Sequence, residues 1–521
     1  MQRFLCVAFA TATLAAGSVA AAPFTCPRTG GDLVFGQEAN INSLDQMASN
    51  TISTRNIAMN MFESLMTRDE NNNAIPELAQ SFEESADKLT YTFKLRQGVK
   101  FHNGKEMTSA DVVASFDRYA RVGLFRSMFD QVEGWSAPDA NTFVIKMKTP
   151  QPTFIELLSS FSVPVVIIPA ELKDDPPQRL RTIGTGPFQL VEFVPGSHVR
   201  MKRFDGYKPN TNFEQRTGFG GYKVACLDTV TFRVVTEASA RVAGLETGEL
   251  HAVEDIPTKA AASMRNNSAI TLLPLQNWWI QIALPNTAIA PTSDLNFRKA
   301  VQAALGMEDI MDAATDGNFR LNVGFQYPNQ ASYSDAGKET YNINDPAVAK
   351  RYLAQSGYKG ETVILLTNRD YPPMYNSALV MQQQLQAVGI KAELRVVDWP
   401  TSVQMSQKVN STEFHFFFTG WGTQPALGAL PTMQFFVSPG AQYRPRDDKD
   451  DPEVLALFRE MNNLPTEAER NAAFARMQKL VLDKAYAFPF GSLTKIQASR
   501  ASVKGFVPFR IPRMANVWLE N

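Results

Sequence analysis

Residues 89–119 carry the sequence LTYTFKLRQGVKFHNGKEMTSADVVASFDRY, and the spacing of their apolar side chains changes partway along. Over residues 89–96, apolar and polar side chains alternate, which predicts a half-buried β-strand. Gln97-Gly98 predicts a turn, and residues 99–101 predict a second short strand.

A helix is expected directly after these two strands. Thr108 precedes Asp111 by three positions, a spacing close to that of a capping box, so we expect the helix to begin there. Apolar residues then recur at helical spacing, at Val112, Val113, Phe116 and Tyr119. The whole stretch therefore predicts a β-β-α unit.

A second type of unit is predicted in the C-terminal half. Residues 345–357 predict a helix, because Pro346 stands just inside its start and Gly357 just past its end. The unbroken apolar run within 361–367 predicts a strand covered on both faces, and a helix over 377–388 and a strand over 390–397 follow it. This order predicts a βαβ crossover in a parallel sheet. Further helices are predicted over 294–305, 452–462 and 466–484.

Length and charge limit the classes of protein to consider. The 521 residues exceed what one hydrophobic core usually serves, so two or three domains are expected. The 51 basic residues nearly balance the 52 acidic ones, which argues against nucleic acid or a membrane surface as the partner. With the units predicted above, the chain is expected to be a mixed α/β protein with several lobes.

The N-terminus predicts export. A short basic start is followed by an uncharged apolar run from Phe4 to Val19 and then by small residues, so we expect residues 1–20 to be a signal peptide cleaved after Ala20. The alternative is an uncleaved membrane anchor, although the run is short for a span. Cys26 lacks the preceding sequence of a lipoprotein anchor.

Two cysteines, Cys26 and Cys226, remain once the signal peptide has been removed. In an oxidising compartment they are available for a disulfide, which would join the mature N-terminus to a segment some 200 residues on. Two unpaired buried thiols are the alternative.

Motifs of catalysis are missing from the sequence. It has no phosphate-binding loop and no Gly-x-Ser-x-Gly elbow, and its glycines at 218–221 read as a flexible loop. The four histidines show no metal-binding spacing. We therefore expect no enzyme activity, no cofactor and no metal site.

Tryptophans give the clearest hint of a binding site. Trp278 and Trp279 are adjacent, and Trp421 lies between Gly420 and Gly422. A tryptophan between glycines is poorly suited to a core strand, so we expect a loop that presents the indole to a ligand. The alternative is that all these rings belong to the core.

These motifs resemble a known family, the substrate-binding proteins of dipeptide, oligopeptide and nickel ABC importers (family 5 extracellular solute-binding proteins). Residues 89–105 and 108–116 resemble the family signature. Shorter family motifs recur in order along nearly the whole mature chain, at residues 75–79, 184–188, 227–233, 297–300 and 386–391.

The resemblance implies a periplasmic binding protein-like α/β fold: two hinge-linked lobes, an additional third domain, and a ligand buried between the lobes. Lobe I would comprise residues 21–49, 187–272 and 492–521, the extra domain II 50–186, and lobe III 273–491. The protein would be a periplasmic monomer that delivers its ligand to a membrane permease with separate ATPase subunits.

The resemblance also suggests site residues. Arg369 matches the position whose arginine binds the ligand carboxylate in dipeptide binders, although it could instead be a surface arginine paired with Asp370. The acid that pairs with a peptide ammonium in those proteins has no counterpart in residues 421–428, which puts a free amino terminus in doubt. The expected ligand-binding residues are Arg369, Trp421, Gly420, Gly422, Thr419, Gln424, Trp278, Trp279, Asn277 and Tyr371.

Three classes of function remain at this point. The first is an importer component that captures a peptide or peptide-like solute. The second is the same fold with an oligosaccharide, an opine-like conjugate, a glutathione-like compound or a metal chelate as ligand. The third is a secreted enzyme or a chaperone-like protein.

Overall fold

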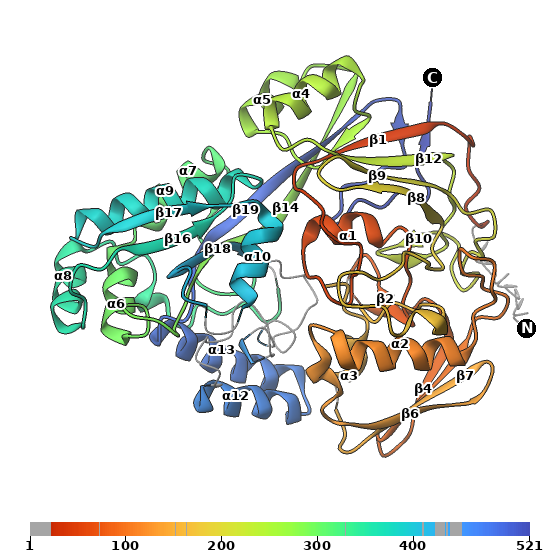
Figure 1. The fold of residues 1–521 in the computed structure, drawn as a ribbon, viewed down its shortest axis with the longest axis horizontal. Helices are drawn as coiled ribbons and strands as arrows, with labels where there is room; N and C mark the ends of the chain where they lie inside the picture. Colours follow the sequence, from red (N-terminus) through yellow and green to blue (C-terminus); the bar gives the residue numbers. More distant parts are fainter. Residues whose placement is uncertain are drawn as a thin grey trace, which may run out of the picture.

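The structure is a computed structural model with mixed α/β architecture (Figure 1). It describes residues 22–71, 73–151, 153–162, 164–328, 330–408, 411–421, 433, 436–437 and 451–520. The predicted signal peptide, residues 1–20, therefore lies outside the described residues.

One large sheet runs through the molecule. Within the described ranges it has eleven strands, in the order β17-β16-β18-β14-β19-β13-β1-β12-β9-β8, with β15 pairing with β19. The strands are β1 (Asp32–Gln37), β8 (Phe188–Val194), β9 (His198–Arg203), β12 (Thr229–Val234), β13 (Ala252–Val253), β14 (Ile270–Pro285), β15 (Phe319–Arg320), β16 (Val363–Thr367), β17 (Ala392–Val396), β18 (Phe416–Trp421) and β19 (Phe488–Arg500).

Strands β14 and β19 join the two ends of this sheet. They pair antiparallel from Ile270 opposite Arg500 to Ala283 opposite Phe488, with an irregularity between Leu275 and Trp279. Beyond the irregularity β14 also pairs with β18, whereas the other end of β19 pairs with β13. Figure 1 shows the two long strands crossing between the halves of the molecule.

One half of the molecule is built on the parallel strands β17, β16 and β18. Its hydrophobic core includes Phe416 and Phe418 of β18 and Leu365 of β16, all of them buried. The helices of this half are α6 (Leu295–Ala304), α7 (Met307–Thr315), α8 (Pro346–Gln355), α9 (Pro372–Ala387), α10 (Trp399–Gln407), α12 (Pro452–Asn463) and α13 (Glu467–Asp483).

The other half holds the remaining strands of the large sheet and a separate antiparallel sheet in the order β4-β5-β7-β6. Both contribute to a second large core. The separate sheet has β4 (Ala79–Glu84), β5 (Thr90–Leu95), β6 (Val132–Asp139) and β7 (Thr142–Met147). The helices here are α1 (Ile52–Ala58), α2 (Ser109–Val122), α3 (Phe154–Leu158), α4 (Ala238–Thr247) and α5 (Thr258–Met264). Short strand pairs complete it: β2 (Met66–Arg68) with β3 (Ala74–Pro76), β10 (Arg216–Thr217) with β11 (Gly220–Gly221), and β20 (Val503–Lys504) with β21 (Trp518–Leu519).

The predicted β-β-α unit is confirmed in its first strand and its helix. Strand β5 occupies residues 90–95, and α2 begins after Thr108 with the capping box to Asp111 in place. The prediction for residues 99–101 was wrong: the chain forms a single bridge between Lys100 and Glu106, because its backbone turns at once through Asn103-Gly104.

The βαβ crossover of the C-terminal half is also confirmed, as β16, α9 and the parallel strand β17. Helix α9 begins at Pro372, five residues before its predicted start, because Pro372 and Pro373 occupy the first helical turn, where a missing N–H costs nothing. Helices α6, α8, α12 and α13 match their predicted positions to within about two residues.

A disulfide joins Cys26 to Cys226, with a Cα–Cα distance of 5.6 Å. It fixes the start of the described chain beside the segment that leads into β12. The backbone of the same region adds the hydrogen bond from the Gly30 N–H to the Cys226 carbonyl at 2.7 Å.

We expect Cys26→Ser to lower the free energy of unfolding by about 2–5 kcal/mol, because the loop that the disulfide closes is long and its opening adds entropy to the unfolded chain. Urea denaturation of the oxidised wild type and the variant measures this difference. Addition of reductant should lower the stability of the wild type to that of Cys26→Ser. Equal stabilities of the oxidised proteins would contradict the expectation.

Candidate functional site

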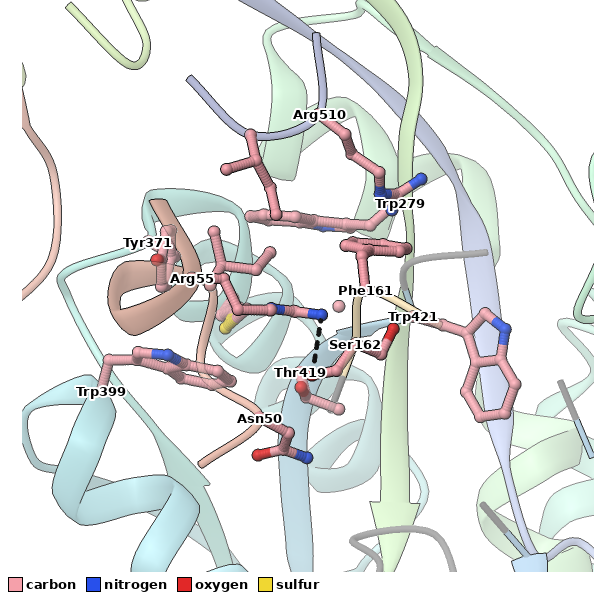
Figure 2. A pocket seen from close by; sticks show the side chains of 14 residues that line it. Asn50, Arg55, Phe161, Ser162, Trp279, Tyr371, Trp399, Thr419, Trp421 and Arg510 are labelled. Atoms are coloured by element: carbon pink, nitrogen blue, oxygen red, sulfur yellow. Dashed lines mark hydrogen bonds between the residues drawn. The ribbon is translucent and has the colours of Figure 1, made fainter. Parts of the chain in front are cut away.

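A cavity of about 70 Å³ lies where the carboxyl ends of the parallel strands face helix α1. Figure 2 shows the side chains that surround it. One wall comes from the half built on β16–β18, and the other from α1 and the segment at Phe161 and Ser162. The residues that line it include Arg55, Trp279, Tyr371, Trp399, Gly420 and Arg510.

The aromatic wall follows from strand topology. Parallel strands end at one edge of a sheet, so residues that follow them gather there. Tyr371 caps α9 shortly after β16, Trp399 is the first residue of α10 after β17, and Trp421 ends β18. The Asp370 carboxylate accepts a hydrogen bond from the backbone N–H of Trp399 at 2.8 Å. This bond connects the segment after β16 to the segment after β17.

The rings meet edge to face. Trp279 and Tyr371 have ring centroids 5.5 Å apart at an interplanar angle of 88°, and Tyr371 and Trp399 have centroids 5.4 Å apart at 87°. This arrangement is favourable for aromatic quadrupoles. The Tyr371 hydroxyl is buried without a hydrogen-bond partner, as is the indole nitrogen of Trp399. The wall is therefore rigid and apolar, with two unused polar groups.

Gly420 allows Trp279 to lie against the sheet. A Cβ at Gly420 would stand 2.6 Å from the Trp279 ring, well inside van der Waals contact. The expectation that Trp421 lies in a loop was wrong, since Gly420 and Trp421 belong to β18. The indole of the neighbouring strand covers the glycine, and this supplies the packing that a glycine lacks.

Arg55 is the buried cation of this cavity. Its side chain projects from α1 into the cavity, and Nη1 donates to the Ser162 carbonyl at 3.5 Å (Figure 2). The guanidinium lies over the Phe161 ring at 5.3 Å. Burial, and then the nearby charge of Arg510, lower the pKa of Arg55 to about 9, so it stays protonated at neutral pH.

A second cavity, of about 250 Å³, adjoins the first and shares Trp279 and Tyr371 with it. Charged residues line much of it, notably Glu38, Arg241, Asp255 and Lys495. Lys495 of β19 forms ion pairs with Glu38 and with Glu254, the latter at 3.2 Å, and its ammonium lies 4.5 Å from the Trp278 ring centroid. This hinge charge cluster (Glu38, Arg241, Glu254, Asp255 and Lys495) therefore lies where β19 passes between the halves.

The cluster has three carboxylates and two cations, so full ionisation would leave one negative charge in excess. Desolvation raises the pKa of Glu38 to about 8; Lys495 opposes this shift, and Glu254 and Asp255 reinforce it. Burial also raises the pKa of Asp255. Near neutral pH the cluster therefore holds a proton that an unfolded chain would release.

The structure brings together part of the predicted site. Trp279, Tyr371, Thr419, Gly420 and Trp421 line the first cavity, but the Trp421 indole points away from Arg55 and packs against Phe325 and Phe436. Gly422 and Gln424 lie outside the described residues.

Three predicted residues lie away from the first cavity. Trp278 lines the second cavity instead. Asn277 lines neither, and with a φ of 54° it occupies the irregularity of β14, a conformation that asparagine tolerates. Arg369 is exposed and lines neither cavity; it stacks on Tyr375 at 4.9 Å and donates to its hydroxyl, and it makes no ion pair with Asp370.

Sequence reasoning missed Trp399, Arg55 and Arg510. Trp399 had a usable signal, because it follows the predicted strand at 390–397 directly and so had to lie at the edge where Tyr371 lies. Arg55 and Arg510 had none, since they reach the cavity from segments 455 positions apart in the chain.

Comparison with known proteins identifies the family. Residues 73–443 match the model of "Bacterial extracellular solute-binding proteins, family 5 Middle". The chain belongs to this family of solute-binding proteins. The family assignment and the periplasmic binding protein-like fold expected from the sequence are thus confirmed. Across the part of the chain that the structure describes, no helix combines the length and hydropathy that a membrane crossing requires.

Relatives and solved structures extend this comparison. A probable peptide ABC transporter periplasmic-binding protein of Sinorhizobium fredii is 26% identical over 92% of each chain. The glutathione-binding protein GsiB of Pectobacterium atrosepticum is 29% identical over 85% of this chain and 83% of its own. The oligopeptide-binding protein AppA of Bacillus subtilis, solved with a nonapeptide, has a TM-score of 0.82 at 22% identity, covering 95% of this chain and 100% of its own, and shares the fold.

We expect Glu38→Gln to flatten the pH dependence of stability between pH 5 and 8. Because folding raises the pKa of Glu38 from 4.5 to about 8, the folded state holds an extra proton in this range, so wild-type stability falls as pH rises through it. Between pH 5 and 8, the free energy of unfolding of the variant should decrease by about 1–4 kcal/mol less than that of the wild type. Thermal melts at constant ionic strength measure it. An unchanged slope would show that Glu38 is ionised throughout.

Proposed function

We propose that this protein captures a peptide or peptide-like solute outside the cytoplasm and delivers it to the permease of an ABC importer. The observation that carries the proposal is the aromatic cavity between α1 and the carboxyl ends of β16, β17 and β18. Ligands of open α/β sheets bind at this edge. The family of solute-binding proteins, and a relative named as a peptide transporter component, support it.

The size of the cavity implies movement. At about 70 Å³ it is far smaller than the roughly 300–1,000 Å³ of typical small-molecule sites, so a peptide enters only if the walls separate. We propose β14 and β19 as the hinge, with lobe I at residues 21–49, 187–272 and 492–521, domain II at 50–186 and lobe III at 273–491. Few strands cross between the halves, which suits rotation about them.

We also propose a cellular location and partners for the protein. Residues 1–20 act as a signal peptide, the mature protein works in the periplasm as a monomer, and ATPase subunits on the far side of the membrane supply energy. The protein returns its solute unchanged. Relatives named as periplasmic binding proteins support the location.

Glutathione is the first solute to test. It is a peptide-like acid, and a relative 29% identical to this chain is named for binding it. An opine-like acid is the second, because the protein AgaA, solved with agropinic acid, shares the fold with a TM-score of 0.80 at 24% identity, covering 94% of this chain and 99% of its own.

Mass spectrometry of solute released from the purified protein, followed by titration calorimetry, tests the function. We expect a peptide-like compound in the released fraction, and saturable binding of it or of glutathione by the emptied protein without turnover. A released sugar or metal chelate, or hydrolysis of the compound, would contradict the peptide assignment.

We expect Gly420→Ala to weaken solute binding about tenfold or more, because the added methyl group displaces the Trp279 ring that forms the cavity wall. Titration calorimetry measures the change. Gly134→Ala is the matched control, since a Cβ there meets nothing within 4 Å. Equal solute affinities for the two variants would show that Trp279 does not contribute to the binding site.

A further inference from the structure

We propose that Arg55 binds a carboxylate of the solute, so that the ligand of the aromatic cavity is an organic acid held at that end by its negative charge. This inference rests on the proposed function, since it names the chemical class that the same cavity accepts. It assigns to Arg55 the role that the sequence suggested for Arg369.

Arg55 is buried without a counter-ion. Its side chain is 9% exposed, and Nε has no hydrogen-bond partner. Among the residues that the structure describes, no carboxylate lies within 4.0 Å of the guanidinium, which contacts the Ser162 carbonyl at the limit of a hydrogen bond and the face of Phe161. Two weak contacts leave most of its five N–H donors unused.

Such a charge is unfavourable in the empty protein. Removing an ion from water costs several kcal/mol unless a partner of opposite charge replaces the water. Here the charge with the largest effect on the pKa of Arg55 is that of another cation, Arg510. Arg510 also lines the cavity and donates to the Trp278 carbonyl at 2.6 Å. Two other buried arginines are better satisfied. Arg118 pairs with Asp45 at 2.6 Å, and Arg298 donates four hydrogen bonds to backbone carbonyls. Over the described residues, no negative charge thus lies beside Arg55.

The position of the Arg55 side chain indicates where a ligand carboxylate would bind. Figure 2 places the Arg55 guanidinium in the middle of the cavity, with Trp279 on one side and Trp399 on the other. A planar carboxylate in this position can accept two parallel N–H donors from the guanidinium fork. The indole rings exclude water from around the pair, which strengthens the attraction.

Arg369 offers none of these conditions. Its guanidinium is exposed and stacked on Tyr375, so solvent screens it and its charge is already tolerated. The difference between the two arginines makes Arg369→Met a control for Arg55→Met, with the same change of charge and of side-chain type.

The first experiment uses the solute-free protein and acetate as the probe. We expect Arg55→Met to melt at a higher temperature than the wild type without any ligand, because methionine removes an uncompensated buried charge. At 100 mM acetate, with chloride as the reference at equal ionic strength, the wild type and Arg369→Met should gain about 1–2 °C, and Arg55→Met should gain nothing. Arg55→Lys should give a smaller gain than the wild type, since it keeps the charge but loses the fork.

Two results would overturn the inference. A lower melting temperature for Arg55→Met than for the wild type would assign Arg55 a structural role. An acetate response that is absent in the wild type, or equal in wild type and Arg55→Met, would place the anion elsewhere. Replacing acetate with inorganic phosphate separates the sources of charge, because a larger gain with phosphate would change the ligand class from carboxylate to phosphate.

The second experiment separates this inference from the proposed function. Titration with glutathione and with its dimethyl ester should show a loss of affinity of about 30-fold or more for the ester, and a similar loss for glutathione on Arg55→Met. Equal binding of acid and ester would overturn the carboxylate site and leave peptide capture intact. Failure of both compounds and of a dipeptide library to bind, with the acetate response present, would overturn peptide capture and leave the anion site intact.

Discussion

The antiparallel pairing of β14 with β19 is the interaction on which the rest of the structure depends. The two strands carry one continuous sheet from the half with mixed strand pairing to the half with three parallel strands. Their own side chains line the cavities: Trp279 of β14 belongs to both, and Trp278 of β14 and Lys495 of β19 belong to the second. The element that connects the halves is therefore also the element that lines the site, so a rotation of one half against the other changes the shape of the cavities directly.

The two cavities differ in the charged groups that line them. The first contains Arg55 and Arg510 in an aromatic enclosure, and the second is lined by both carboxylates and cations of the hinge charge cluster. The charges are kept apart by the edge-to-face pair of Trp279 and Tyr371. Separation of this kind is unfavourable for folding. A buried arginine placed next to the carboxylates would give each group a counter-ion. On the proposal that Arg55 binds a carboxylate, this separation keeps the guanidinium available to the solute.

Local patterns predicted much of the fold, and non-local contacts account for what was missed. The alternation over residues 89–96 and the capping residues of α2 are local signals, and both gave the correct element. Trp421 was placed in a loop because its glycine neighbours offer no packing of their own, yet Trp279 from another strand supplies it. The absence of an acid after Trp421 is a feature of the sequence alone, and it could not reveal that Asp255 and Glu38 gather in an adjoining cavity. Arg55 was missed for the same reason, since burial without a counter-ion is a property of the assembled fold alone.

Tyr371 and Trp279 belong to the walls of both cavities, and this shared boundary has a thermodynamic consequence. A solute that displaces these rings as it fills the first cavity also alters the surroundings of Glu38. The proton affinity of Glu38 depends on its desolvation. Solute binding in the first cavity and protonation of Glu38 in the second are then thermodynamically linked. Each changes the free energy of the other by the same amount. Near neutral pH the heat of solute capture accordingly includes a contribution from protons exchanged with the medium, whose size follows the ionisation enthalpy of the buffer.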